Sequence, residues 1–284
     1  MNLETILVIG AGTMGAGIAQ VAARSGFRTI LFDTQAEALE RAVRQTKIDL
    51  QKLEAKGKIT ASEMQATLAR LQISTMLEDA TEAQFVIEAA SENLEVKHAI
   101  FRNLEAHVSA DTLLATNTST ISISAIAGVL EHPERAIGLH FFNPATIMPL
   151  VEVIRAEQTS NRTLERALRV VQAFAKTAVV TKDSPGFLVN RIARPFYLEA
   201  LRMLEAGADV SMIDQALRGA GFKMGPLELI DLIGLDVNLA SSKSVYEAFF
   251  QDPKYRPSTI QQRMVDVGRL GRKTGRGFYN YEEA

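Results

Sequence analysis

The chain has 284 residues, 47% of them hydrophobic, and its 31 basic and 33 acidic residues leave a formal charge of -2. This length suffices for two domains with sizeable cores, and the near balance of charge excludes a whole-chain field that attracts nucleic acid or an anionic membrane. The absence of cysteine excludes disulfides, thiolate catalysis and cysteine zinc sites, and we expect no bound metal. No apolar run reaches the roughly 20 residues that span a bilayer, and the N-terminal residues lack a signal-peptide pattern. We therefore expect a cytoplasmic protein.

The first half alternates strand patterns with helix patterns. An apolar run from Ile6 to Ile9 enters the segment Gly10-Ala-Gly-Thr-Met-Gly15, after which apolar residues recur at helical spacing as far as Ser25. A second strand, from Thr29 to Phe32, ends at Asp33. Further strands are predicted over 85–88, 113–116, 135–142, 150–154 and 178–181, with helices over 94–107 and 164–174. This alternation predicts an α/β fold with a Rossmann-like, doubly wound parallel sheet.

Two features depart from a simple alternation. Residues 36–55 contain neither glycine nor proline and predict a helix of about 30 Å, which a turn at Lys56-Gly-Lys58 and a second helix over 61–71 complete as a projecting hairpin. Beyond a turn-rich joint at 182–186, only helices are predicted, over 187–206, 211–219, 226–248 and 259–268. We expect a Rossmann-like domain over 1–183 and an all-α C-terminal domain over 184–284.

The motif Gly10-x-Gly12-x-x-Gly15 follows a predicted strand and opens a predicted helix, which is typical of a dinucleotide site. The three glycines permit a tight turn, close approach to a pyrophosphate and close packing of helix on strand, and the helix N–H groups face the anion. Asp33 lies where a carboxylate accepts hydrogen bonds from a ribose and repels a 2'-phosphate, so we expect NAD. FAD, or a simple glycine turn with Asp33 as a helix cap, is the alternative.

His140 and Glu152 stand twelve residues apart in otherwise apolar sequence. Imidazole titrates near neutral pH, and a carboxylate bonded to its far nitrogen would fix its tautomer and raise its basicity. Such a pair moves protons. The alternative is a core histidine beside a strand glutamate that faces solvent.

Four segments in this order resemble the 3-hydroxyacyl-CoA dehydrogenase family, including its bacterial 3-hydroxybutyryl-CoA and 3-hydroxyadipyl-CoA members. They are Asn117-Thr-Ser119, His140-Phe-Phe-Asn-Pro144, Glu152 and Ser184-Pro-Gly-Phe-Leu-Val-Asn190. The resemblance covers nearly the whole chain, since it extends to residues 86–97, 225–229 and 271–281. It implies reversible NAD-dependent oxidation of a short-chain 3-hydroxyacyl-CoA. In that reaction His140 is the catalytic base, Glu152 orients it, and Ser119 and Asn190 bond the substrate's 3-oxygen.

The resemblance also implies the remaining contacts and partners. The cofactor-binding residues would be Gly10, Gly12, Thr13, Met14, Gly15, Asp33, Ala89, Glu92, Lys97 and Asn117, and Lys56 would lie near the CoA phosphates. Taken singly, the charged members of this set also fit surface charges or helix caps. The active site would be completed between the two domains, and the C-terminal domain would form a homodimer.

Some residues depart from the family pattern, and two other functions remain open. Asp49 replaces a common asparagine or serine that meets CoA, Pro149 replaces a lysine, and Lys223 replaces a proline. Arg191 or Arg194 could pair with a distal carboxylate of a 3-hydroxyadipyl group. A catalytically silent, crystallin-like NAD-binding protein is one alternative. Another is a different hydroxyacid dehydrogenase, but residues 186–190 lack the lysine base that it needs.

Overall fold

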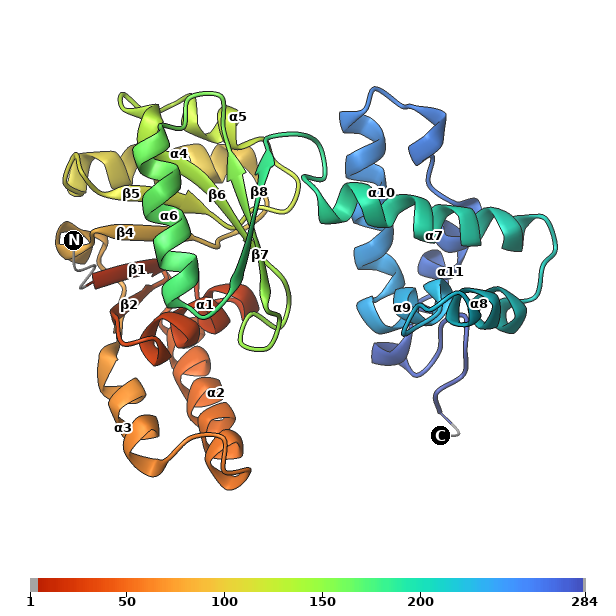
Figure 1. Ribbon diagram of the computed structural model, residues 1–284, viewed down its shortest axis with the longest axis horizontal. Helices are drawn as coiled ribbons and strands as arrows, with labels where there is room; N and C mark the ends of the chain where they lie inside the picture. The colour runs from red at the N-terminus through yellow and green to blue at the C-terminus, as the bar shows by residue number, and fades with distance from the viewer. Residues whose placement is uncertain (1–4, 283–284) are drawn as a thin grey trace. The chain divides into compact units, whose positions relative to one another are not determined.

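The computed structural model describes residues 5–282, which fall into two units. The first unit ends at Ser184 and the second begins at Pro185 (Figure 1). The joint between them is the turn-rich segment 182–186, where the last strand of the sheet gives way to the first helix of the second unit.

The first unit is built on one eight-stranded sheet, which confirms the Rossmann-like fold. Its strand order is β3-β2-β1-β4-β5-β6-β7-β8, and the order reverses beside β1, where a doubly wound sheet binds its ligand. The strands are β1 (Thr5–Ile9), β2 (Arg28–Phe32), β3 (Leu71–Ser74), β4 (Phe85–Glu88), β5 (Leu113–Thr116), β6 (Ala136–Phe141), β7 (Leu150–Arg155) and β8 (Thr177–Lys182).

The sheet differs from the expected one in two places. β6 and β7 pair in antiparallel fashion, whereas all other neighbouring strands are parallel. Residues 142–149 are too few for the crossover of a dozen or more residues that a parallel pair needs. The edge strand β3 was not predicted, because its four residues are exposed or only half-buried and show no apolar run.

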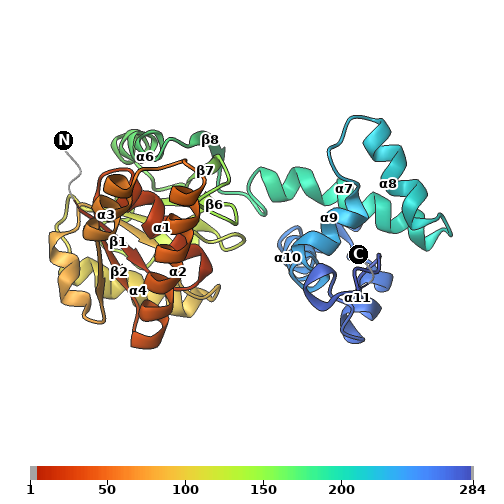
Figure 2. The ribbon, with the colours of Figure 1, turned by 90° about the horizontal axis from the view of Figure 1, so that it is seen from below.

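Helices cover both faces of the sheet (Figures 1 and 2). Alternation along β1 places Ile6 and Val8 in one buried cluster with Ile18 and Val170, while Leu7 lies in a second cluster on the other face. The first face carries α1 (Thr13–Arg24), α2 (Ala36–Ala55) and α6 (Asn161–Ala173), and the second carries α4 (Leu94–His107) and the short α5 (Ile123–Ala127). α5 was not predicted, since one and a half turns leave little periodic signal.

The predicted helical hairpin is present as α2 and α3 (Ala61–Arg70) and extends away from the sheet in Figure 1. The second arm begins at a capping box, in which the Thr60 hydroxyl accepts a hydrogen bond from the Glu63 N–H and the Glu63 carboxylate accepts one from the Thr60 N–H. Thr60 and Glu63 thus fix where the chain turns back toward the sheet.

The second unit is helical, as expected, with its own buried core. The predicted helix over 226–248 is wrong as one piece, because Gly234 takes a φ of 103° and breaks it in two. The helices of the second unit are α7 (Val189–Glu205), α8 (Val210–Gly219), α9 (Pro226–Ile233), α10 (Leu235–Ala248) and α11 (Thr259–Asp266).

Residues 271–281, which are rich in glycine and tyrosine, are held to the rest of this unit by two carboxylates. Asp231 accepts hydrogen bonds from the Phe278 and Tyr279 N–H groups and from the Tyr281 hydroxyl. The Tyr279 hydroxyl donates to Asp214. Burial raises the pKa of Asp231 above its usual value, although these hydrogen bonds oppose the shift. Residues 271–281 therefore have a structural explanation within the second unit.

Candidate active site

His140 and Glu152 face each other because β6 and β7 pair in this register. His140 is 5% exposed and Glu152 is fully buried. The imidazole Nδ1 lies 2.6 Å from Glu152 Oε2, and because a carboxylate only accepts, Nδ1 carries the proton and donates it. Nε2 of the neutral ring is thereby left as the basic nitrogen.

Ser119 lies beside that basic nitrogen. It belongs to the loop after β5, and its Oγ is 3.0 Å from His140 Nε2, so the hydroxyl donates to the ring. The side chain of Asn117 anchors the same loop to β6 by accepting the Phe141 N–H at 2.9 Å. The structure therefore brings Ser119, His140 and Glu152 into one line of hydrogen bonds, a geometry suited to taking a proton from a hydroxyl placed near Ser119.

Three charged side chains, those of Glu92, Lys97 and Glu88, support the loop that carries Ser119. Glu92 accepts four hydrogen bonds from residues 118–120. Lys97, which we expected at the cofactor, is 1% exposed, and its ammonium group bonds both oxygens of Glu88. Glu88 was missed by sequence reasoning. A glutamate that ends an apolar strand is the signal that could have drawn attention to it.

Asp183 was also missed. It lies at the joint after β8 and accepts hydrogen bonds from the Ser122 hydroxyl and from the Ile123 and Ser124 N–H groups at the start of α5. Capping satisfies helix N–H groups that have no partner within the helix. The loop that carries Ser119 is thus tied directly to the joint, an attachment between residues about sixty positions apart that no sequence pattern reports.

The glycine loop lies where the strand order reverses. Gly10 has a φ of 100°, and a Cβ on it would lie 2.7 Å from the carbonyl oxygen of Ala89, which follows β4. A Cβ on Gly15 would lie 1.8 Å from the Gly10 oxygen. Asp33 holds the loop by accepting the Ala11 N–H at 2.7 Å. Only glycine therefore fits at positions 10 and 15.

The surroundings of this loop fit a dinucleotide. No side chain caps α1, whose first residues are Thr13 and Met14, so its first N–H groups can meet an anion. Nothing lies within 4 Å of a Cβ built on Gly12, which leaves room for a close approach to the backbone. A cavity of about 720 Å³ runs beside the loop, and its lining includes Asp33 and Ala89.

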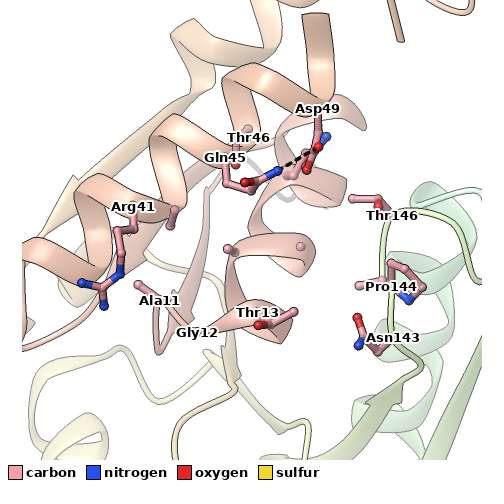
Figure 3. Close-up of a pocket in the computed structure, with 15 residues that line it drawn as sticks. Ala11, Gly12, Thr13, Arg41, Gln45, Thr46, Asp49, Asn143, Pro144 and Thr146 are labelled. Atoms are coloured by element: carbon pink, nitrogen blue, oxygen red, sulfur yellow. Dashed lines mark hydrogen bonds between the residues drawn. The ribbon is translucent and has the colours of Figure 1, made fainter. Parts of the chain in front are cut away.

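A second cavity, of about 420 Å³, lies between α1, α2 and the loop after β6 (Figure 3). Asp49 lines it and accepts a hydrogen bond from the Gln45 side chain. Lys56 is exposed at the end of α2, seven residues beyond Asp49 and so on the same helix face.

The loop that closes this second cavity is held by Lys176. Its ammonium group donates to the carbonyl oxygens of Ala145 and Met148, at 2.7 Å each. Burial, with a smaller effect from nearby Arg24, lowers the pKa of Lys176. β6 ends at Phe141, so Lys176 fixes the loop that begins a few residues after His140.

Three predicted or considered side chains belong to the second unit. Asn190 lies in the first turn of α7 and is half-buried. Arg194 is 3% exposed and donates to the Asn238 carbonyl oxygen and the Ser242 hydroxyl, so it is engaged within that unit. Arg191 is exposed, with its guanidinium 5.5 Å from the centre of the Phe249 ring. Of the two arginines, Arg191 alone remains suited to a ligand carboxylate.

Residues 5–282 contain neither a cluster of metal ligands nor a membrane-spanning helix. No three histidine, aspartate or glutamate side chains in this range converge as metal ligands. Within the same range, none of the helices has both the length and the apolar character required to cross a bilayer.

Comparisons with known proteins assign both units. Residues 5–184 match the family model of the 3-hydroxyacyl-CoA dehydrogenase NAD binding domain, and residues 186–281 match that of the 3-hydroxyacyl-CoA dehydrogenase C-terminal domain. The chain is 50% identical over 283 residues to the 3-hydroxyadipyl-CoA dehydrogenase of Escherichia coli K12. This alignment covers 99% of the chain but 60% of that relative, so the chain spans less than two thirds of the relative's length.

Other relatives match along their whole length. A probable 3-hydroxybutyryl-CoA dehydrogenase of Bacillus subtilis is 42% identical, with 100% of this chain and 99% of the relative covered. The crystal structure of (S)-3-hydroxybutyryl-CoA dehydrogenase from Ralstonia eutropha superposes with a TM-score of 0.95 at 41% identity, and covers 99% of this chain and 100% of that one. The names of these two relatives both give a 3-hydroxybutyryl group, whereas the name of the Escherichia coli relative gives a 3-hydroxyadipyl group.

Two glycine substitutions separate folding from cofactor binding. Gly12→Ala meets open space, so we expect an unchanged melting temperature but a loss of NAD binding, because the new methyl group fills the room that the pyrophosphate needs. Gly15→Ala collides with the Gly10 carbonyl, so we expect destabilisation of about 1–3 kcal/mol or more. Thermal unfolding and calorimetric titration with NAD measure both effects. A Gly12→Ala variant that binds NAD normally would contradict this assignment.

Proposed function

Because the chain belongs to the 3-hydroxyacyl-CoA dehydrogenase family, we propose that it oxidises a short-chain 3-hydroxyacyl-CoA to the 3-oxoacyl-CoA, reversibly and with NAD. The observation that carries this proposal is the line of hydrogen bonds from Ser119 through His140 to Glu152. In this arrangement Glu152 fixes the tautomer of the base, His140. The Ser119 hydroxyl donates to Nε2, the nitrogen that takes the proton.

In the oxidative direction, His140 Nε2 takes the proton of the 3-hydroxyl group. Glu152 stabilises the imidazolium that forms, because its carboxylate is fully buried and bonded to Nδ1. Ser119 and Asn190 donate hydrogen bonds to the 3-oxygen as negative charge develops on it. Reduction follows the same path backwards, with His140 as the acid.

The residues of the first unit fit NAD. When bound, NAD supplies the hydride acceptor. The N–H groups at the start of α1, which no side chain caps, would meet the pyrophosphate. The Asp33 carboxylate would accept hydrogen bonds from the adenosine ribose, which favours NAD over NADP. Ala89, Glu92 and Asn117 would complete the cofactor contacts. Lys97, whose ammonium group is buried against Glu88, would support them through Glu92.

The remaining parts of the proposal concern the substrate carrier and the assembly. Lys56 is exposed at the hairpin and suits the CoA phosphates, while Asp49 on the same helix face disfavours them.

We assign NAD binding to residues 1–183, and completion of the substrate site and homodimerisation to residues 184–284. The dimer is supported by large apolar side chains exposed on the second unit, namely Ile192, Met212, Phe222, Leu232, Val237 and Phe250. The protein acts in the cytoplasm, apart from membranes and nucleic acid.

A catalytically silent NAD-binding protein is the competing function. Such a protein has no need of a buried histidine whose tautomer a carboxylate fixes and whose other nitrogen meets a hydroxyl. The geometry of His140 therefore favours the enzyme.

Replacement of the base tests the proposed function. His140→Gln should lower kcat for 3-hydroxybutyryl-CoA oxidation by about 10²- to 10⁴-fold and leave NAD affinity intact, because the glycine loop is untouched. Nicotinamide absorbance measures turnover and calorimetry measures NAD binding. His132→Gln, at an exposed histidine, is the control and should retain full activity. Persistent turnover in His140→Gln would refute the assignment of the base, and a wild-type protein inactive on all 3-hydroxyacyl-CoA substrates would favour the silent protein.

The acyl group is tested by a substrate pair. If Arg191 pairs with a distal carboxylate, kcat/KM is higher for 3-hydroxyadipyl-CoA than for 3-hydroxybutyryl-CoA. Arg191→Gln should then lower the former by about 10- to 100-fold, since a hydrogen bond to a charged group contributes about 1.5–3 kcal/mol. The butyryl substrate is the internal control, because it has no carboxylate to lose. A strong preference of the wild-type protein for the butyryl substrate would contradict the proposed pairing of Arg191 with a distal carboxylate.

A further inference from the structure

Glu88 is a buried carboxylate that the proposed reaction does not use. It is the last residue of β4 and lies in the centre of the sheet, paired in register with Ile9 and Thr116. Its side chain is fully buried. A carboxylate in this position must be paired and hydrogen-bonded to be tolerated in the interior.

Each oxygen of Glu88 receives two donors. Oε1 accepts from the Ala90 N–H at 2.7 Å and from the Lys97 ammonium group at 2.7 Å. Oε2 accepts from the same ammonium group at 2.8 Å and from the Thr116 hydroxyl at 2.6 Å. Glu88 and Lys97 therefore form a closed ion pair that joins the end of β4 to α4 and, through Thr116, to the end of β5.

From this ion pair the contacts continue to the candidate base. Lys97 Nζ lies 3.8 Å from Glu92 Oε2. The other oxygen of Glu92 accepts four hydrogen bonds of 2.7–3.1 Å from residues 118–120. Within this loop, the Ser119 hydroxyl donates to His140 Nε2. The buried Lys97 ammonium group is thus next to the Glu92 carboxylate that holds the Ser119 loop.

Stability alone does not explain a fully buried ion pair. Removing two charges from water costs about as much as their attraction returns, and apolar side chains of similar volume often stabilise a core equally well. What the ion pair adds is a fixed position for the cation, because the Glu88 carboxylate holds the Lys97 ammonium group at one point at the end of the sheet. A fixed cation in turn favours one position of the partly exposed Glu92 carboxylate.

We propose that Glu88 is a positioning residue for the dehydrogenase reaction, which acts through Lys97 and Glu92 to hold Ser119 against His140. The role rests on the proposed function of this site. Glu88 touches neither substrate nor cofactor, and its effect falls on the placement of the Ser119 hydroxyl. Displacing this hydroxyl by a fraction of an ångström weakens its hydrogen bond to the substrate oxygen in the transition state.

Two measurements on a Glu88→Gln variant test this role. Hydrogen exchange of a peptide that covers residues 117–122 should become on the order of tenfold faster, because the amides of Ser119 and Thr120 lose their fixed acceptor. At saturating NAD and substrate, kcat should fall on the order of tenfold or more, while the KM for substrate stays within about twofold. Unchanged exchange and unchanged kcat would overturn the proposal.

A double-mutant cycle with Ser119→Ala shows whether Glu88 acts through Ser119. Residues that act through one group are not additive. In the Ser119→Ala background, Glu88→Gln should therefore cause no further loss of kcat. An equal loss in both backgrounds would mean that Glu88 acts on the site by another route, and the proposal would be wrong.

Glu105→Gln is the matched control. Glu105 belongs to the same unit, pairs with Arg135 and accepts two backbone N–H groups, but its contacts lead away from Ser119. It should lower the melting temperature without changing kcat or the exchange of residues 117–122. Parallel losses in both variants would show a general loss of stability and overturn the positioning role.

A charge-balanced variant keeps the test decisive if Glu88→Gln does not fold. Glu88→Gln with Lys97→Met removes both charges, so no lone buried ion remains. It should fold, yet retain the low kcat and the fast exchange, and wild-type values of both would refute the proposal. The exchange measurement needs no turnover. A wild-type protein without dehydrogenase activity would therefore refute the proposed function while the positioning of the loop is still tested.

Discussion

The hydrogen bond between His140 Nδ1 and Glu152, at 2.6 Å across two antiparallel strands, is the interaction on which the rest of the site depends. It exists because residues 142–149 return the chain as a hairpin-like connection, where the rest of the sheet uses crossovers. A one-residue shift in this register would send one of the two side chains to the opposite face. The strand pairing that makes the sheet mixed is therefore also what brings the proposed base, His140, against Glu152.

Carboxylates organise the loops around this pair. Loops at the end of a sheet leave backbone N–H groups without ladder partners, and buried N–H groups need acceptors. Asp33 takes one from the glycine loop, Glu92 takes two from the Ser119 loop, and Asp183 takes two from the start of α5. Behind Glu92, the buried cation of Lys97 is paired with Glu88.

Local sequence was sufficient for the features that arise locally. The glycine motif, the hairpin helices and the apolar strands were predicted because each is encoded within about twenty residues. The His140 and Glu152 pair followed from chemistry and resemblance. β3 and α5 were too short to leave a pattern, and the turn at Gly234 was hidden by apolar residues on both sides. Glu88 and Asp183 were missed because their partners are distant in sequence. Arg194 was considered as a ligand for a distal carboxylate until its contacts with α10 showed that it is engaged within the second unit.

Single-turnover formation of NADH by a Glu152→Gln variant tests the base most directly. Glutamine keeps the size of the side chain and can still accept from Nδ1, but it cannot balance the positive charge of an imidazolium. If His140 and Glu152 act as a pair, the rate falls by about 10³-fold or more, with the fold of the first unit and NAD affinity unchanged. A rate within about tenfold of the wild-type value would show that Glu152 does not support proton transfer and that His140 works without it.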